Sequence, residues 1–452
     1  MDLVIQTGLG QTRVELLDLL HRDSLVPAEQ AEQRRADVAG PIERALDADV
    51  RRSARRRSRS PPTGQGCRRT RVEVDAHSAR QNTGMTEATT ATDPTTFRAQ
   101  FPVLERLSYL NAGTEGPIPR AAAEAVRERI AVEADGGRCG RPYFEGLMEL
   151  AARARAGYAT ALGCDPSEVA LTGSTTDGVN TVIAGLDLRP GEEIVTSDQE
   201  HPGLLAPLGR ARRRHRVKIR VVPFAEIAGE VSTATRLVAC SHVSWVGGEV
   251  ADVAALASTG VPVLLDAAQA LGAVPLAVRA LGCDFYAGSG QKWLCGPEGS
   301  GALYVREERL EELLVPWPGY GSVADPANAL EFEQAGGVKR FDHGFPAGMR
   351  SAWAAASLGV FEEAGWDWVY ERAASLAAAL AERLAERGLS VSPRGRSTLV
   401  SWAAEDADAE VARLAGEGVI VRSIPAFGLV RASVGAWTSE EEIERLVGLA
   451  AR

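Results

Sequence analysis

Lysine is scarce in this sequence. Of the 50 basic residues in the 452-residue chain, only Lys218, Lys292 and Lys339 are lysines, and the remainder are arginines. A bias toward arginine is also what GC-rich coding produces, so the scarcity by itself assigns no function. It does limit the chemistry, because a reaction that needs a side-chain amine has only these three candidates.

Cysteines, paired histidines and long apolar runs are also limited. Six cysteines without a CxxC pair indicate free thiols in a reducing compartment. The six histidines show no HxxxH or HExxH spacing, so no metal site is expected. A run of about 18 uncharged apolar residues is absent, and the first residues lack the pattern of a secretory signal. We therefore expect a cytoplasmic protein without a membrane partner.

Acidic residues are missing from one stretch near the N-terminus. Residues 51–71 contain nine arginines and no acid. Such a run repels itself, so we expect residues 1–84 to be disordered, with at most a short helix at 14–22. The segment is interpreted as a solvated tail, a nucleic-acid-binding arm or sequence upstream of a natural start at Met85. TGLGQT, at 7–12, holds only part of a dinucleotide fingerprint, and no strand is expected before it.

The rest of the chain is acidic. After residue 84 the sequence holds 35 basic and 48 acidic residues, and the whole chain has a pI near 5.4. A surface of this charge is not expected to coat nucleic acid.

Strand-like and helix-like patterns alternate from about Phe97 onward. Continuous runs of valine, leucine and isoleucine bounded by turns indicate strands that are buried on both faces. Strands that alternate with helices imply βαβ units and a mostly parallel sheet. The predicted strands of this part lie at 168–173, 192–198, 218–224, 235–244 and 261–270.

The pattern changes after about Ser351 to long alanine-rich helices, short strands and a final helix near residue 440. We therefore predict an α/β fold with a large domain at 115–345 and a smaller α+β domain at 346–452. Residues 85–114 would join the smaller domain.

Two predicted turns carry groups that could do chemistry. Asp266 ends a buried strand and precedes Gln269, and open α/β sheets bind ligands at the carboxyl ends of their strands. A helix-capping aspartate is the alternative. Lys292 lies beside Trp293 in a turn of small residues, 26 positions after Asp266. This setting can desolvate the amine and lower its pKa, whereas a solvated surface lysine is the alternative.

Three further features are weaker when each is taken alone. The turn 172–178 (TGSTTDG) precedes a helix, and backbone N–H groups and hydroxyls at a helix N-terminus can bind phosphate. Serine and threonine are also common helix caps. His201 follows a predicted strand and, alone, indicates only a loop residue. Arg422 and Arg431 flank a Pro/Gly turn and could hold a carboxylate bidentately.

In their order and spacing, these features resemble the class V aminotransferase family of pyridoxal-phosphate (PLP) enzymes, fold type I, from about Phe101 to Arg452. The resemblance implies a mostly parallel, seven-stranded sheet in the large domain and a homodimer. Carried over by position, Lys292 would form the Schiff base with PLP and act as the catalytic base. Asp266 would pair with the pyridine nitrogen, and Gln269 would bond the phenolic oxygen of the ring.

The same resemblance implies the remaining site roles. His201 would stack on the ring face. Arg431, with Arg422, would bind the α-carboxylate of an amino-acid substrate. The residues that would hold the phosphate are Thr175, Thr176, Ser289 and Gln291.

Within the family, residues 101–120, 198–206 and 241–250 look like those of cysteine/cystine C–S lyases, and less closely like isopenicillin-N-epimerase-like proteins. Cysteine desulfurases carry a nucleophilic cysteine shortly before the carboxylate-binding arginine, whereas no cysteine follows Cys295 here. Trp245 stands where many members have asparagine. The resemblance thus implies β-elimination from cysteine, cystine or an S-substituted cysteine. Aminotransferase, epimerase or desulfurase-like activity is the alternative, and a non-catalytic PLP-binding regulator is a more remote one.

Overall fold

The computed structural model describes residues 2–7, 10–15 and 92–450. The chain divides into two units, residues 1–87 and 88–452, which are described separately. In the first unit, β1 (Asp2–Thr7) pairs antiparallel with β2 (Gly10–Glu15).

This N-terminal hairpin corrects two expectations. A strand does precede TGLGQT, and residues 14–15 of the predicted helix belong to β2. The β-branched residues Val4, Ile5 and Val14 favour strands. Because β2 returns antiparallel, the pair is not the strand–turn–helix of a dinucleotide site. The arginine run and the rest of the predicted helix and of the predicted disorder lie outside the described residues.

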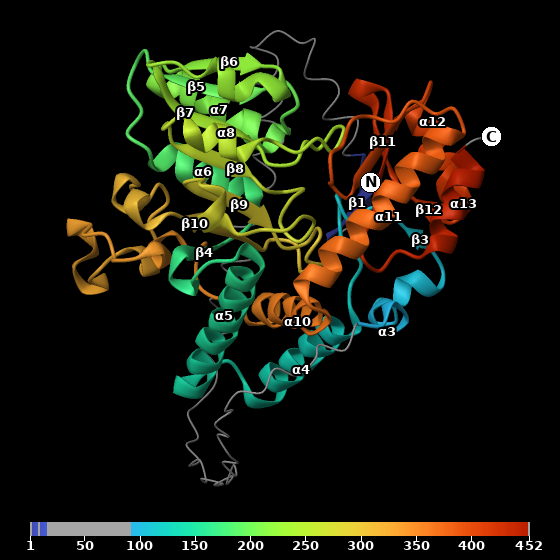
Figure 1. Ribbon diagram of the computed structural model, residues 1–452. Helices are drawn as coiled ribbons and strands as arrows, with labels where there is room; N and C mark the ends of the chain where they lie inside the picture. Colours follow the sequence, from blue (N-terminus) through green and yellow to red (C-terminus); the bar gives the residue numbers. More distant parts are fainter. Residues whose placement is uncertain (1, 8–9, 16–91, 451–452) are drawn as a thin grey trace, which may run out of the picture. The chain divides into compact units, whose positions relative to one another are not determined.

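A seven-stranded sheet forms the centre of the second unit (Figure 1). Its order is β4-β10-β9-β8-β7-β5-β6, and within this sheet only β10 runs antiparallel to its neighbours. The predicted mostly parallel α/β sheet is confirmed. The strands are β4 (Val169–Thr172), β5 (Glu193–Ser197), β6 (Lys218–Val222), β7 (Thr235–Ser241), β8 (Val263–Asp266), β9 (Phe285–Ser289) and β10 (Gly301–Val305).

Helices cover both faces of this sheet, which explains why its strands read as continuous apolar runs. Successive strand residues alternate between two cores; Leu264 and Phe285 enter one, and Leu265 and Tyr286 enter the other. The first core includes α6 (Thr175–Gly185) and α7 (Pro202–His215). The second includes α5 (Gly140–Leu162), α8 (Val253–Ser258), α9 (Val278–Leu281) and α10 (Gly348–Ala364).

Helix α10 lies in sequence within the predicted small domain, yet it packs against α5 and α4 (Arg120–Gly136). Its Leu358 and Phe361 are buried in the core of the large sheet. Figure 1 shows α10 beneath the sheet, beside α4 and α5. An alanine-rich helix can pack closely against many partners. Composition alone therefore did not indicate which core this helix joins.

A third apolar core surrounds the C-terminal strands. Strands β11 (Leu399–Ala403), β14 (Leu429–Ser433) and β13 (Arg422–Ile424) form an antiparallel sheet, and β12 (Val419–Ile420) pairs in parallel with β3 (Ser108–Tyr109). Residues before 115 therefore pack with the C-terminal segment. The helices here are α11 (Trp366–Glu386), α12 (Ala407–Gly416) and α13 (Glu440–Ala450), whereas α3 (Pro94–Arg98) contributes Phe97 to the core that also holds α5 and α10. No helix among the described residues is long and apolar enough to cross a membrane.

Candidate active site

Polar side chains gather where the central strands end. Strands β5, β7, β8 and β9 end at Ser197, Ser241, Asp266 and Ser289. Ser241 is paired with Asp266, which in turn is paired with Ala287, so these ends lie side by side at one edge of the sheet. In a mostly parallel sheet this carboxyl edge is where ligands bind.

Asp266, which is buried, and Lys292, which is partly buried, are oppositely charged groups at this edge. The Oδ1 atom of Asp266 accepts a hydrogen bond of 2.9 Å from the N–H of Ala268. Burial raises the pKa of Asp266, and its hydrogen bond and the Lys292 charge oppose that rise. Burial also lowers the pKa of Lys292 to about 8, although Asp266 favours the charged amine. Lys292 is therefore partly neutral near physiological pH, as a nucleophile or base requires.

The N-terminus of α6 offers an anion site. Ser174 caps the helix by accepting a hydrogen bond of 3.1 Å from Asp177 N–H. The neighbouring Thr175 hydroxyl is buried and has no hydrogen-bond partner among the described residues, and the same holds for the hydroxyl of Ser289 and Oε1 of Gln291. Unpaired buried hydroxyls are costly, so they indicate a ligand that accepts from them. The helix N-terminus favours a negatively charged one.

Thr176, in the first turn of α6, lies close to the first turn of α7. A Cβ atom added to Gly203 would lie 2.5 Å from Thr176 Oγ1 and 3.1 Å from Nδ1 of His201. The first turns of α6 and α7 therefore approach each other closely, and only glycine fits between them. The structure thus brings predicted phosphate and ring contacts together.

His201 caps α7 with its ring. Its Nδ1 accepts a hydrogen bond of 3.0 Å from Gly203 N–H. Burial, and then the positive charge of Lys292, lower the pKa of His201 to about 4. The ring is therefore neutral at physiological pH. It also packs edge to face on Trp245, with 5.1 Å between the ring centroids.

Gln269 is held from two sides. Its Nε2 donates to the Gly113 carbonyl at 2.8 Å, and its Oε1 accepts from the indole N–H of Trp293 at 3.1 Å. A Cβ atom on Gly113 would lie 2.8 Å from Oε1 of Gln269 and 3.0 Å from Nη2 of Arg431. Glycine at position 113 thus lets Gln269 lie close to Arg431. The side-chain amide of Gln269 is fixed by Trp293, the residue that follows Lys292.

Arg422 and Arg431 face each other across β13 and β14. Arg431 is fully buried; its Nη1 donates to the Trp245 carbonyl at 2.6 Å, whereas Nε and Nη2 have no partner among the described residues. Burial and the neighbouring Arg422 lower the pKa of Arg431 to about 9. Arg422 donates weakly to the Thr114 hydroxyl at 3.4 Å. In the described part of the chain neither arginine forms an ion pair, so the two attract an anionic ligand group.

The structure therefore brings together the side chains that the sequence analysis selected, although their roles toward a ligand stay predictions. It also adds Glu200 and Gly113, which the sequence analysis did not select, and shows that Trp293 donates to Gln269. Glu200 gave one signal, an acid directly before the selected His201. Among the described residues, no cluster of three metal-ligating side chains occurs.

Comparison with known proteins identifies the family. The class V aminotransferase family matches residues 109–446. A probable cysteine desulfurase of Pseudomonas aeruginosa is 30% identical over 405 residues, which cover 78% of this chain and 96% of that protein. Isopenicillin N epimerase of Streptomyces clavuligerus is 34% identical over 260 residues, but the match spans 52% of this chain and only 63% of the epimerase.

Solved structures agree with this relationship. A cystine C–S lyase in complex with its reaction product cysteine persulfide matches with a TM-score of 0.73 and 28% identity, covering 78% of this chain and 99% of the lyase. A cysteine desulfurase from Thermococcus onnurineus matches with a TM-score of 0.72 and 25% identity, covering 80% and 98%. The chain belongs to the class V aminotransferase family, whose members are PLP-dependent enzymes of fold type I.

The residues present fit PLP. The unpaired hydroxyls of Thr175 and Ser289 and the α6 N-terminus suit its phosphate. Asp266 is a buried carboxylate without an ion-pair partner among the described residues, which suits a protonated pyridine nitrogen. Lys292 supplies the partly neutral amine.

Proposed function

We propose that this protein is a PLP-dependent lyase that cleaves the Cβ–S bond of cysteine, cystine or an S-substituted cysteine. The observation that carries the proposal is a site with a partly neutral lysine, unpaired buried hydroxyls and two arginines without ion pairs among the described residues, but with no reactive thiol beside them. No cysteine lies after Cys295, and Cys295 itself is buried, with a thiol pKa raised well above its usual value. A sulfur group released at this site therefore leaves as product instead of moving to a protein thiol.

We assign the chain's residues the following work. Arg431 and Arg422 hold the substrate's α-carboxylate and so direct the Cα–H bond toward Lys292. The Lys292 amine takes the Cα proton. His201, neutral at physiological pH, covers the ring face, and Thr175, Thr176, Ser289 and Gln291 hold the phosphate, while Gln269 binds the phenolic oxygen. PLP, when bound, serves as the electron sink that Asp266 sustains by pairing with its ring nitrogen.

The direct test is product analysis. We expect purified holo-protein to release pyruvate and ammonia from cysteine, cystine or S-alkylcysteines without any keto-acid acceptor. Accumulation of pyridoxamine phosphate, with pyruvate absent, would show an aminotransferase instead. A change in the substrate's chirality without loss of its sulfur would show an epimerase, the activity named for the Streptomyces clavuligerus relative.

Replacement of Lys292 tests the central amine. Lys292→Ala is expected to abolish turnover and the visible absorbance of bound PLP, because the lysine amine of the site is removed. Lys218→Ala is the matched control, since Lys218 is exposed on β6 and its replacement should leave both properties unchanged. Substantial lyase activity in Lys292→Ala would refute the mechanism.

We also propose a cytoplasmic homodimer with large and small domains at 115–345 and 346–452, of which α10 packs against the large domain. The described cysteines are all free thiols, which suits a reducing compartment. Exposed apolar side chains support self-association: Met148, Trp317, Tyr320 and Phe345 line a cavity of about 540 Å³. Monomers rarely leave so many large apolar groups in contact with water.

A further inference from the structure

Glu200 is a buried carboxylate that joins the ends of two strands. Its Oε1 accepts hydrogen bonds from the Ser197 hydroxyl at 2.5 Å, at the end of β5, and from Ser241 N–H at 3.0 Å, at the end of β7. Its Oε2 accepts from Ser241 N–H at 2.9 Å and from the Ser241 hydroxyl at 2.5 Å. Glu200 is 5% exposed and forms no ion pair among the described residues. Burial raises the pKa of Glu200 to about 7 against the effect of these hydrogen bonds, so the carboxyl group is held by neutral donors alone.

A second pair of contacts joins the same two loops. The Ser244 hydroxyl donates to Oε1 of Gln199 at 2.5 Å, and Nε2 of Gln199 donates to Glu249 at 3.4 Å. The loop after β5 is thus fastened to the loop after β7 at Glu200 and again at Gln199. Two attachments prevent rotation about either one.

The two loops carry different parts of the site. His201, assigned above to the ring face, follows Glu200 directly, and the Lys292 charge that lowers its pKa shows that it lies near the amine. The other loop carries Trp245, whose ring touches His201 and whose carbonyl accepts from Arg431. The relative position of the two loops therefore sets the distance between the cofactor face and the carboxylate-binding arginine.

We propose that Glu200 is a positioning residue that clamps the His201 loop to the Trp245 loop and so aligns the PLP ring with the substrate carboxylate. The proposal rests on the PLP site assigned above. A displacement of about 1 Å in such a site can cost around a hundredfold in rate. Glu200 needs no contact with PLP or substrate to have this effect.

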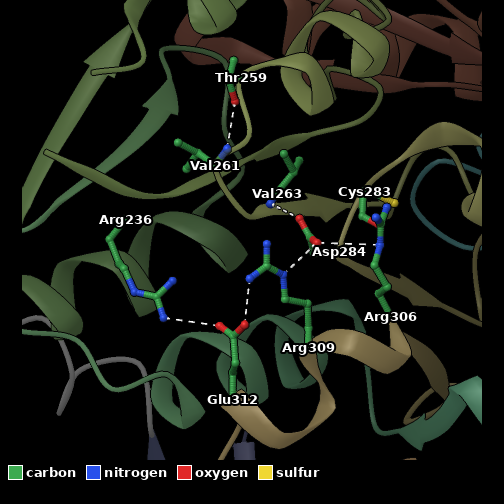
Figure 2. Close-up of polar contacts among 9 residues, drawn as sticks. All are labelled: Arg236, Thr259, Val261, Val263, Cys283, Asp284, Arg306, Arg309 and Glu312. Atoms are coloured by element: carbon green, nitrogen blue, oxygen red, sulfur yellow. Dashed lines mark hydrogen bonds and ion pairs between the residues drawn. The ribbon is translucent and has the colours of Figure 1, made fainter. Parts of the chain in front are cut away.

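Asp284 provides a matched control in the same sheet (Figure 2). It is also a buried carboxylate that accepts from a backbone N–H, that of Val263 at 2.8 Å, and it contacts Arg309 at 3.0 Å. It directly precedes β9, so it lies at the amino end of the strand, opposite the candidate site. Its removal should reduce stability without moving His201 or Trp245.

The experiment compares Glu200→Ala, Glu200→Gln and Asp284→Ala for PLP dissociation constant, visible circular dichroism of bound PLP and thermal unfolding. We expect Glu200→Ala to weaken PLP binding by about tenfold or more and to reduce the circular dichroism, which reports ring orientation. Glu200→Gln should lie between wild type and Glu200→Ala, since the amide retains one acceptor. Asp284→Ala should lower the unfolding temperature yet keep PLP affinity within about twofold of wild type.

Two results would overturn the clamp: unchanged PLP affinity and circular dichroism in Glu200→Ala, or equal losses in Asp284→Ala. If Glu200→Ala does not fold, Glu200→Gln decides, and wild-type affinity and dichroism in that variant refute the proposal. Wild-type protein that binds PLP but transaminates would refute the lyase and leave the clamp comparison intact.

Discussion

At the scale of single residues, burial explains most of the chemistry at this site. Lys218 and Lys339 are exposed, whereas burial lowers the pKa of Lys292 to about 8. Burial likewise lowers the pKa of Arg431 to about 9 and leaves two of its nitrogen atoms unpaired among the described residues. Both groups are largely removed from water, and Arg431 forms no ion pair among the described residues, so cofactor and substrate are their natural partners.

The pKa of Lys292 predicts how apo-protein takes up PLP. The neutral amine is the reactive form. Because the pKa of Lys292 is about 8 instead of the usual 10.5, the neutral fraction rises steeply up to about pH 8. The rate of PLP incorporation should therefore rise about tenfold per pH unit below 8 and level off above it. Stopped-flow absorbance across this range measures the rate. Continued steep increase up to pH 10 would show an ordinary, solvated lysine.

The order and spacing of Lys292, Asp266 and His201 along the chain were enough to select them through the family resemblance, although Asp266 and His201 taken alone were ambiguous. Glu200 could not be selected in this way. Its importance depends on Ser241, which lies 41 residues away and becomes its neighbour only when β5 and β7 pair. Likewise, only the folded chain shows that Gln269 is fixed by Gly113.

At the scale of elements, continuous apolar runs predicted the central strands well because both faces of the sheet are covered. The N-terminal hairpin was missed, since its short apolar stretch was read with a helical period. The packing of α10 was also not readable from sequence. Its alanine-rich surface is compatible with several partners, and tertiary contacts with α4 and α5 determined the outcome.

Helix α6 gives a prediction at this scale. Thr175→Val removes a buried hydroxyl that has no partner among the described residues. The apo-protein should unfold at the same or a higher temperature, because an unpaired buried hydroxyl costs about 1–3 kcal/mol. PLP should nevertheless bind about tenfold more weakly, because hydrogen bonds to a charged phosphate are worth about 1.5–3 kcal/mol.

Thr181→Val, on the same helix, is the control. The Thr181 hydroxyl already donates to the Asp177 carbonyl at 2.9 Å, so this change should lower stability slightly and leave PLP affinity unaltered. Calorimetric unfolding and PLP titration measure both quantities. Equal PLP affinities of Thr175→Val and wild type would exclude Thr175 from the phosphate site.

At the scale of the whole molecule, the exposed apolar side chains around Tyr320 predict self-association. Tyr320 is 77% exposed, so Tyr320→Glu should not disturb the folded monomer. It should weaken the dimer, because a charge would be buried at the interface. Sedimentation velocity at several concentrations measures the change. Val221→Glu, at an exposed position on β6, is the control, and identical behaviour of both variants would contradict an interface at this cavity.

The strand order also determines which side of the candidate active site loosens first. Lys292 lies on the connection between β9 and β10, both interior strands of the seven-stranded sheet, whereas Arg422 lies on β13, an edge strand. Interior backbone amides exchange with solvent only through large-scale opening, and edge strands exchange through local fraying. Spontaneous fluctuations should therefore loosen Arg422 before Arg431, which lies on the interior strand β14, so that one of the two carboxylate contacts can release while Lys292 stays in place.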